Sequence, residues 1–279
     1  MQVKSKQRLL LFGKIILFLI TLIVLFLLCS IILEIIPRNE IYTPLWFLIE
    51  GGFNLFIGFA ILALFVKVID KEKLIYSGWF SLKSRVKDFF LGGLYGSICV
   101  FIGFLIIINL NWHQVETAPL RILFLSSSFL TLLCGAFLEE ALFRGYMLRK
   151  LLEKFSPFVS LTLTSLIFVG FHCSNPDITF LSIINIFLAS FLLGMLFIKT
   201  GNIWLVVGFH LFWNYLQSLL GFNVSGSDYP SLLFLNFESE NLFNGGYFGF
   251  EGSYVCSIIL LLALMIMNEN LQKWYDLSK

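Results

Sequence analysis

Long apolar segments separated by short polar ones cover most of this chain, and this pattern predicts membrane-spanning helices. A helix needs about 20 mainly apolar residues to cross a hydrocarbon core about 30 Å thick. Eight segments approach or exceed that length, at residues 9–36, 44–69, 89–110, 122–144, 157–173, 179–198, 203–220 and 254–267. The predicted fold class is therefore all-α, a polytopic membrane protein with about eight transmembrane helices.

Composition supports a membrane protein and argues against a nucleic-acid-binding protein. Hydrophobic residues make up 58% of the 279 residues and charged residues only 13%, whereas soluble domains are about 25% charged. The formal net charge of +2 is small and dispersed, and a nucleic-acid-binding surface needs Lys and Arg gathered on one face. The lipid bilayer is the expected partner, and nucleic acid is not.

The distribution of Lys and Arg predicts the orientation, because cytoplasmic loops carry an excess of these residues. Basic residues gather in the N-terminal tail, the 70–88 loop, the 144–154 turn and at Lys199, and the other connections are poor in them. We expect a multi-pass protein with both termini in the cytoplasm. The 221–252 segment has acidic but no basic residues, which indicates an outer loop along the headgroups. No repeat divides the chain, so 1–279 forms one domain.

Two adjacent carboxylates, Glu139 and Glu140, and the nearby Arg144 end an apolar segment. Ionisable groups inside a membrane are costly and are functional-site candidates. On a helix, Glu140 and Arg144 are i,i+4 neighbours that can pair, whereas Glu139 points about 100° away. Glu139 is therefore predicted to be the carboxylate available for chemistry.

Two of the three histidines, His172 and His210, also lie in apolar segments, and Asn214 follows His210 by four residues. Helix geometry places Glu139 and His172 each about 24 Å from the turn at residues 155–157, and His210 about 13 Å from the next turn. The fourth and fifth segments form one hairpin, and the sixth and seventh form the next. If the first of these hairpins protrudes farther into the cytoplasm than the second, one layer in the cytoplasmic half of the bilayer holds Glu139, His172, His210 and Asn214. His210 and Asn214 share a helix face, as do Phe168 and His172; Phe168 is expected to be a pocket wall.

Such a cluster suits hydrolysis. A buried carboxylate beside a histidine can deprotonate water, and donors one turn apart can stabilise an oxyanion. Zinc is the alternative, with Glu139, His172 and His210 as ligands and water in the fourth position, although no H-E-x-x-H helix is present. These residues alone leave both chemistries open.

The order Glu139-Glu140-x-x-x-Arg144, Phe168-x-x-x-His172 and His210-x-x-x-Asn214 resembles the motifs of the CAAX protease and bacteriocin-processing (Abi) family of intramembrane proteases. The resemblance covers residues 126–217 and implies a catalytic core within 89–220, with the helices enclosing an intramembrane catalytic cavity. It implies that Glu139 with His172 activates water and that His210 with Asn214 stabilises the oxyanion. Glu140 with Arg144 would brace the helix.

The resemblance also implies a glutamate protease of a bacterial cell membrane that needs no cofactor, with zinc dependence as the alternative. Its substrate would be a membrane-bound peptide or a lipidated protein tail, reached from the cytoplasmic side. A non-catalytic bacteriocin-immunity or chaperone-like membrane protein is the alternative function, and a transporter that uses buried carboxylates as a proton relay is a third.

Overall fold

The computed structural model describes residues 2–34, 44–72, 82–110, 113–237 and 239–268, and all eight apolar segments form helices within them. Two π-helical stretches, Phe65–Ile69 and Ala141–Leu148, continue α2 and α4. Residues 73–81 of the basic loop lie outside the described residues. The α-helices are α1 (Gln2–Glu34), α2 (Pro44–Leu64), α3 (Leu82–Leu110), α4 (Ile122–Glu140), α5 (Arg149–Leu152), α6 (Pro157–His172), α7 (Phe180–Thr200), α8 (Ile203–Leu219) and α9 (Tyr254–Asn268).

Five helical spans are long and apolar enough to cross a membrane: Lys6–Leu33, Leu48–Ile69, Arg85–Leu110, Ile122–Leu152 and Phe180–Thr200. The helices Pro157–His172 and Tyr254–Met267 are apolar but shorter. Many large apolar side chains on α1, α2, α3 and α9 face outward, as expected for lipid contact. The fold is that of an all-α polytopic membrane protein, as predicted.

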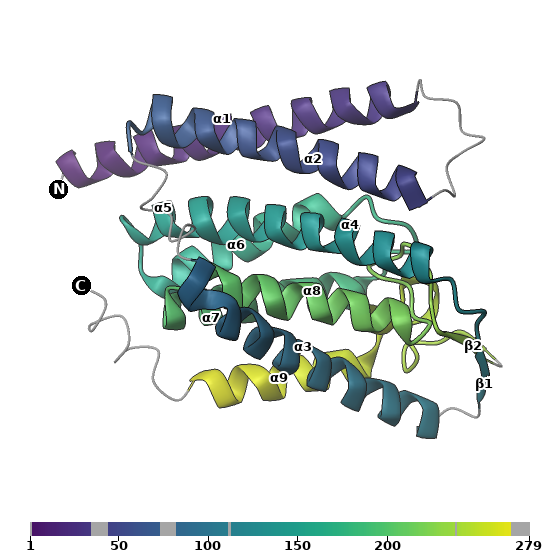
Figure 1. Cartoon of the computed structure of the whole chain (residues 1–279). Coiled ribbons are helices and arrows are strands. Elements are labelled where there is room, and N and C mark those ends of the chain that lie inside the picture. Colours follow the sequence, from purple (N-terminus) through teal and green to yellow (C-terminus); the bar gives the residue numbers. More distant parts are fainter. Residues whose placement is uncertain (1, 35–43, 73–81, 111–112, 238, 269–279) are drawn as a thin grey trace.

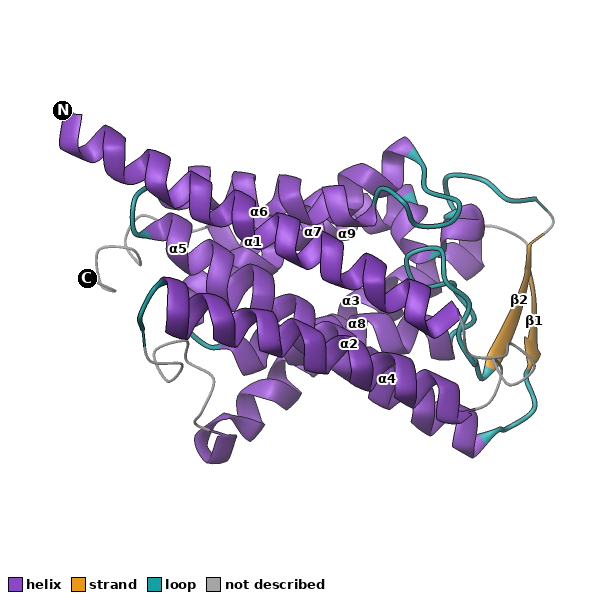
Figure 2. Ribbon diagram, turned by 90° about the horizontal axis from the view of Figure 1, so that it is seen from above, coloured by secondary structure: helices purple, strands orange, loops and turns teal. Residues whose placement is uncertain are grey.

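The helices form one bundle, with α1 and α2 side by side along one edge (Figure 1). Inside it, α4 packs against α2 and α8, while α7 packs against α6 and α9. The N-terminus and α5 lie at one end, and the strands lie at the other (Figure 2). We call these the basic end and the strand end.

Glycines bring α3 unusually close to α8. A Cβ atom at Gly92 or Gly96 would collide with the carbonyl oxygens of Leu205 or Phe209, and one at Gly208 with that of Phe89. Small residues four apart allow helix backbones to approach in this way. The contact fixes the position of α8, which carries His210 and Asn214.

Local signals set the ends of the helices beside the site. The Ser156 side chain accepts a hydrogen bond at the start of α6, and Thr179 and Ser182 form a capping box at the start of α7. Gly201, with φ of 57°, ends α7 in the left-handed conformation, which glycine adopts at little cost. The Asn202 side chain then caps α8. These caps end α7 at Thr200 and begin α8 at Ile203, so the turn between the two helices is short.

The strand end differs from the sequence-based expectation for residues 221–252. Strand β1 (His113–Thr117) pairs antiparallel with β2 (Leu233–Phe237), so the segment contributes one strand of a two-stranded sheet. Phe222, Val224, Phe248 and Phe250 are buried against the helices. The segment is therefore packed into the bundle and does not simply lie along its surface.

Candidate active site

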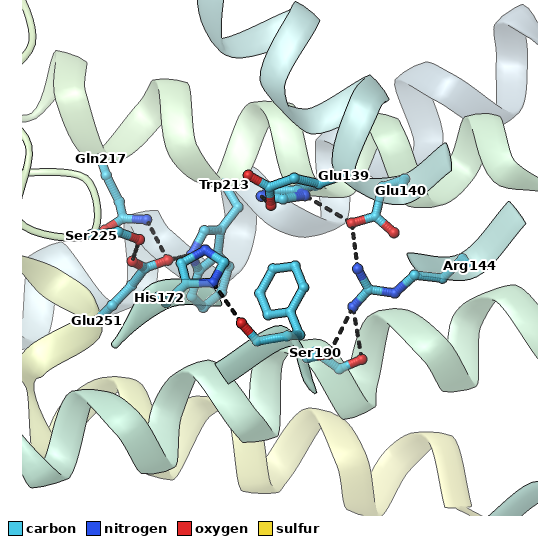
Figure 3. A network of polar contacts seen from close by, with 11 residues as sticks. Glu139, Glu140, Arg144, His172, Ser190, Trp213, Gln217, Ser225 and Glu251 are labelled. Atoms are coloured by element: carbon cyan, nitrogen blue, oxygen red, sulfur yellow. Dashed lines mark hydrogen bonds and ion pairs between the residues drawn. The ribbon is translucent and has the colours of Figure 1, made fainter. Parts of the chain in front are cut away.

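The two adjacent carboxylates at the end of α4 have different environments. Glu140 is fully buried, and its Oε1 atom lies 2.8 Å from Nη1 of Arg144, so the expected i,i+4 ion pair forms. Arg144 also donates through Nη2 to the backbone carbonyl and the hydroxyl of Ser190 on α7, at 2.9 and 3.1 Å. Figure 3 shows Arg144 between Glu140 and Ser190. The pair therefore joins α4 to α7.

The same Glu140 oxygen has a second partner that sequence analysis did not anticipate. The Nδ1 atom of His210, on α8, lies 2.8 Å from Glu140 Oε1. The other ring nitrogen, Nε2, lies 3.9 Å from Oε2 of Glu139. His210 therefore stands between the two carboxylates, hydrogen-bonded to the buried one and close to the other.

Glu139 faces a cavity of about 440 Å³. Its side chain is 35% exposed, whereas that of Glu140 is completely buried. The sequence predicts that Glu139 and Glu140 point in different directions from the helix, and in the structure they do: Glu140 points into the protein and Glu139 toward the cavity. The other predicted residues also line this cavity: Phe168, His172, His210 and Asn214.

His172 faces the cavity from the last residue of α6. Its Nδ1 atom lies 2.8 Å from the backbone carbonyl oxygen of Phe168, and its ring packs against the Phe168 ring with centroids 4.4 Å apart. Among the contacts of the described residues, no hydrogen bond joins His172 to Glu139. The two share the cavity, but in this structure His210 is the histidine close to Glu139.

Phe168 forms part of the cavity wall and also contacts the ion pair. Its ring lies 5.0 Å from the Arg144 guanidinium carbon and meets Phe143 edge-on, with centroids 4.9 Å apart. The stacking of a guanidinium on an aromatic face is favourable. Phe168 therefore separates His172 from Arg144 and contacts both.

The residues named for the zinc alternative do not converge. Within the described ranges, no group of three or more His, Cys, Asp or Glu side chains is arranged to hold a metal ion. Glu139, His172 and His210 lie around one cavity, and each histidine makes its hydrogen bond to protein through Nδ1, which leaves Nε2 available, as it is in most metal-ligating histidines. Metal-free hydrolysis and the zinc alternative therefore both stay predictions.

Sequence analysis missed Glu251, which also lines the cavity. Its Oε1 atom accepts from Trp213 Nε1 at 2.8 Å and from Gln217 at 3.4 Å, and Oε2 accepts from the Ser225 hydroxyl (Figure 3). Trp213 and Gln217 are four residues apart on α8, so the sequence shows that they share a helix face. Their partner, Glu251, lies in an irregular segment, where helical spacing gives no direction for its side chain. Four residues of the 221–252 segment join Glu251 at the cavity: Val224, Ser225, Ser227 and Tyr229.

The fold and the cavity define an all-helical membrane protein with paired carboxylates, two histidines and an asparagine around an internal space. Residues 121–216 match the Rce1-like family model, whose description is type II CAAX prenyl endopeptidase Rce1-like. The match runs from the start of α4 almost to the end of α8, includes every predicted site residue and confirms the resemblance found in the motifs. At the level of the family it supports a CAAX-type protease. Neither the curated proteins nor the solved structures contain a match to this chain.

Proposed function

We propose that this protein is an intramembrane endopeptidase that hydrolyses a peptide bond in a membrane-associated peptide or a lipidated protein tail. The observation that carries the proposal is the difference between the adjacent carboxylates. Glu140 is buried and used by Arg144 and His210, while Glu139 faces a cavity large enough for a peptide segment. If Glu140 and Arg144 served only as a structural ion pair, the second carboxylate, Glu139, would not be needed.

Glu139 is the group that activates water in this proposal. A carboxylate can take a proton from water while the water oxygen adds to the peptide carbonyl carbon. His172 faces the same cavity and supports this step. No metal takes part in this mechanism, so the negative charge that develops on the carbonyl oxygen needs hydrogen-bond donors from the protein.

Asn214 supplies such a donor from α8, one turn beyond His210. An amide group donates two hydrogen bonds, and Asn214 lines the cavity. His210 was expected to donate beside it. Because Nδ1 of His210 is directed at Glu140, it can donate toward the cavity only through Nε2.

The cavity indicates the end of the bundle from which substrate enters. Glu50, Ser225 and Ser227 line it; Ser225 and Ser227 belong to the segment that forms the strand end, and Ser227 is exposed. If the basic end is cytoplasmic, as the Lys and Arg distribution predicts, this access is on the outer side. We therefore propose entry at the strand end as an alternative to the expected approach from the cytoplasmic side.

Comparison of membrane-peptide profiles tests the function. Cells that carry the wild-type protein should lack peptides that accumulate with Glu139→Gln, because the amide cannot act as the base. Glu50→Gln is the matched control, since Glu50 is a second carboxylate on the cavity wall and has no role in the proposed mechanism. Identical profiles for wild type and Glu139→Gln, with both proteins folded, would favour the non-catalytic binding protein.

Chemical labelling tests the direction of entry. Cys99, Cys134 and Cys173, which are partly or fully exposed, are first replaced by serine, and Ser227→Cys is then introduced. A membrane-impermeant maleimide added outside intact cells should label Cys at position 227 and block cleavage. Labelling only after the cells are opened would place the strand end in the cytoplasm.

A further inference from the structure

One oxygen of Glu140 receives two hydrogen bonds from two different helices. Nη1 of Arg144 and Nδ1 of His210 each lie 2.8 Å from Oε1. The carboxylate and the guanidinium are fully buried, and His210 is 9% exposed. Water therefore has little access to this junction, and the protein groups determine where the protons lie.

The charges at the junction fix the direction of the histidine hydrogen bond. Arginine stays protonated in proteins, so Arg144 keeps Glu140 in its ionised form. An ionised carboxylate has no proton to give and can only accept. The His210 nitrogen that faces it, Nδ1, must therefore carry the hydrogen.

We propose that Glu140 is a positioning residue that holds His210 as the Nδ1–H tautomer, so that in the neutral ring the Nε2 atom facing Glu139 is a hydrogen-bond acceptor. A neutral imidazole has one N–H group. With that group directed at Glu140, the ring presents a lone pair to the cavity. This arrangement assigns to Glu140 a function beyond its pairing with Arg144.

The tautomer itself does not depend on the proposed function, but its consequence for catalysis rests on it. A neutral His210 accepts a hydrogen bond from water or substrate at Nε2 and cannot donate to an oxyanion. Asn214 then remains as the amide donor of α8 at the cavity. His210 becomes a donor toward the cavity only after Nε2 has taken up a proton.

Nitrogen NMR of the full-length protein in detergent tests the tautomer directly. The chain has three histidines, so selective ¹⁵N-histidine labelling gives few signals, which His113→Gln and His172→Gln assign. At a pH where the ring is neutral, His210 should show a protonated Nδ1 and an unprotonated Nε2. A protonated Nε2 with an unprotonated Nδ1 would overturn the proposal, whether or not the protein cleaves peptides.

The role of Glu140 needs a variant and an internal control. In Glu140→Gln the neutral amide no longer requires an N–H donor, so His210 should shift toward the Nε2–H tautomer. His172 is the control, because its Nδ1 donates to the Phe168 carbonyl and its tautomer should not change. An unchanged His210 spectrum in folded Glu140→Gln would contradict the positioning role.

Substitutions of His210 provide a second measurement that does not depend on Glu140→Gln folding. The amide nitrogen of asparagine lies near the position of Nδ1, and that of glutamine near the position of Nε2. His210→Asn should therefore keep the hydrogen bond to Glu140 and melt at a higher temperature than His210→Gln. The opposite order would contradict the proposal.

Discussion

Two clusters of charged groups in this protein illustrate different uses of a carboxylate. The basic-end cluster consists of Lys14, Asp70, Glu72, Tyr146, Arg149 and Lys150. There, Lys14 and Tyr146 contact the two oxygens of Asp70 at 2.5 and 3.1 Å, and Lys150 and Arg149 contact those of Glu72 at 2.5 and 2.8 Å. Each oxygen of these two carboxylates has a protein partner.

The cavity cluster, which consists of Glu139, Glu140, Arg144 and His210, is only partly paired. Glu140 resembles the basic-end carboxylates only at its Oε1 atom, which is hydrogen-bonded to Arg144 and His210, because its Oε2 atom is buried without a hydrogen-bond partner among the described residues. Glu139 instead faces the cavity, and its Oε2 atom lies 3.9 Å from Nε2 of His210. Glu140 is held in a buried ion pair and Glu139 faces the cavity, and this difference is the basis for proposing Glu139 as the functional carboxylate.

The largest expected effect is the loss of activity in Glu139→Gln. General acid–base catalysis contributes about 10²- to 10⁴-fold, so kcat for a cleaved membrane peptide should fall by at least that factor. The melting temperature in detergent should change little, because Glu139 is partly exposed and not part of the buried pair. If this variant were less stable than Glu140→Gln, the distinction between the two carboxylates would be wrong.

Breaking the buried pair should instead destabilise the protein. Glu140→Gln or Arg144→Gln leaves one buried charge without its partner, which costs about 3 to 5 kcal/mol. Chemical or thermal unfolding in detergent measures this loss. Variants that are as stable as the wild type would show that the pair is not what joins α4 to α7.

Asn214→Ala should separate binding from turnover. Loss of one oxyanion-hole donor lowers kcat by about 10²- to 10³-fold, while KM and the melting temperature should stay close to those of the wild type. Steady-state kinetics on a purified substrate provides the measurement. An unimpaired Asn214→Ala variant, together with chelator-sensitive cleavage, would point to a zinc-dependent mechanism.

The smallest effect is expected in the basic-end cluster. Burial raises the pKa of Glu72, but the hydrogen bonds and charges of Lys150 and Arg149 lower it more, so the pKa of Glu72 lies below 4.5 in the folded protein. A lowered folded pKa gives stability that is present above the unfolded pKa and is lost as pH falls through the folded pKa.

Glu72→Gln should therefore cost about 0 to 1 kcal/mol near neutral pH, since the pairs are partly exposed. The difference from the wild type should vanish as the pH falls below the folded pKa. Unfolding curves from pH 7 to pH 3 measure it. A difference that persists at pH 3 would show that packing, and not charge, is the contribution of Glu72.

The sequence by itself determined the features that depend on local spacing. Apolar length predicted all eight helices, and helical periodicity separated Glu139 from Glu140 and paired Glu140 with Arg144. The motif residues were found because polar side chains are rare in apolar segments. Their roles in hydrolysis, the absence of a required metal and the orientation in the membrane stay predictions.

Only the tertiary structure decided which side chains from different helices meet. It placed His210, and not His172, beside the carboxylates of α4, and it brought Glu251 and part of the 221–252 segment to the cavity. Helical spacing fixes the direction of a side chain only relative to its own helix. How each helix is turned and how closely it approaches its neighbours depend on packing between distant residues, such as Gly92 and Gly96 of α3 against α8, and no pattern within one segment encodes that.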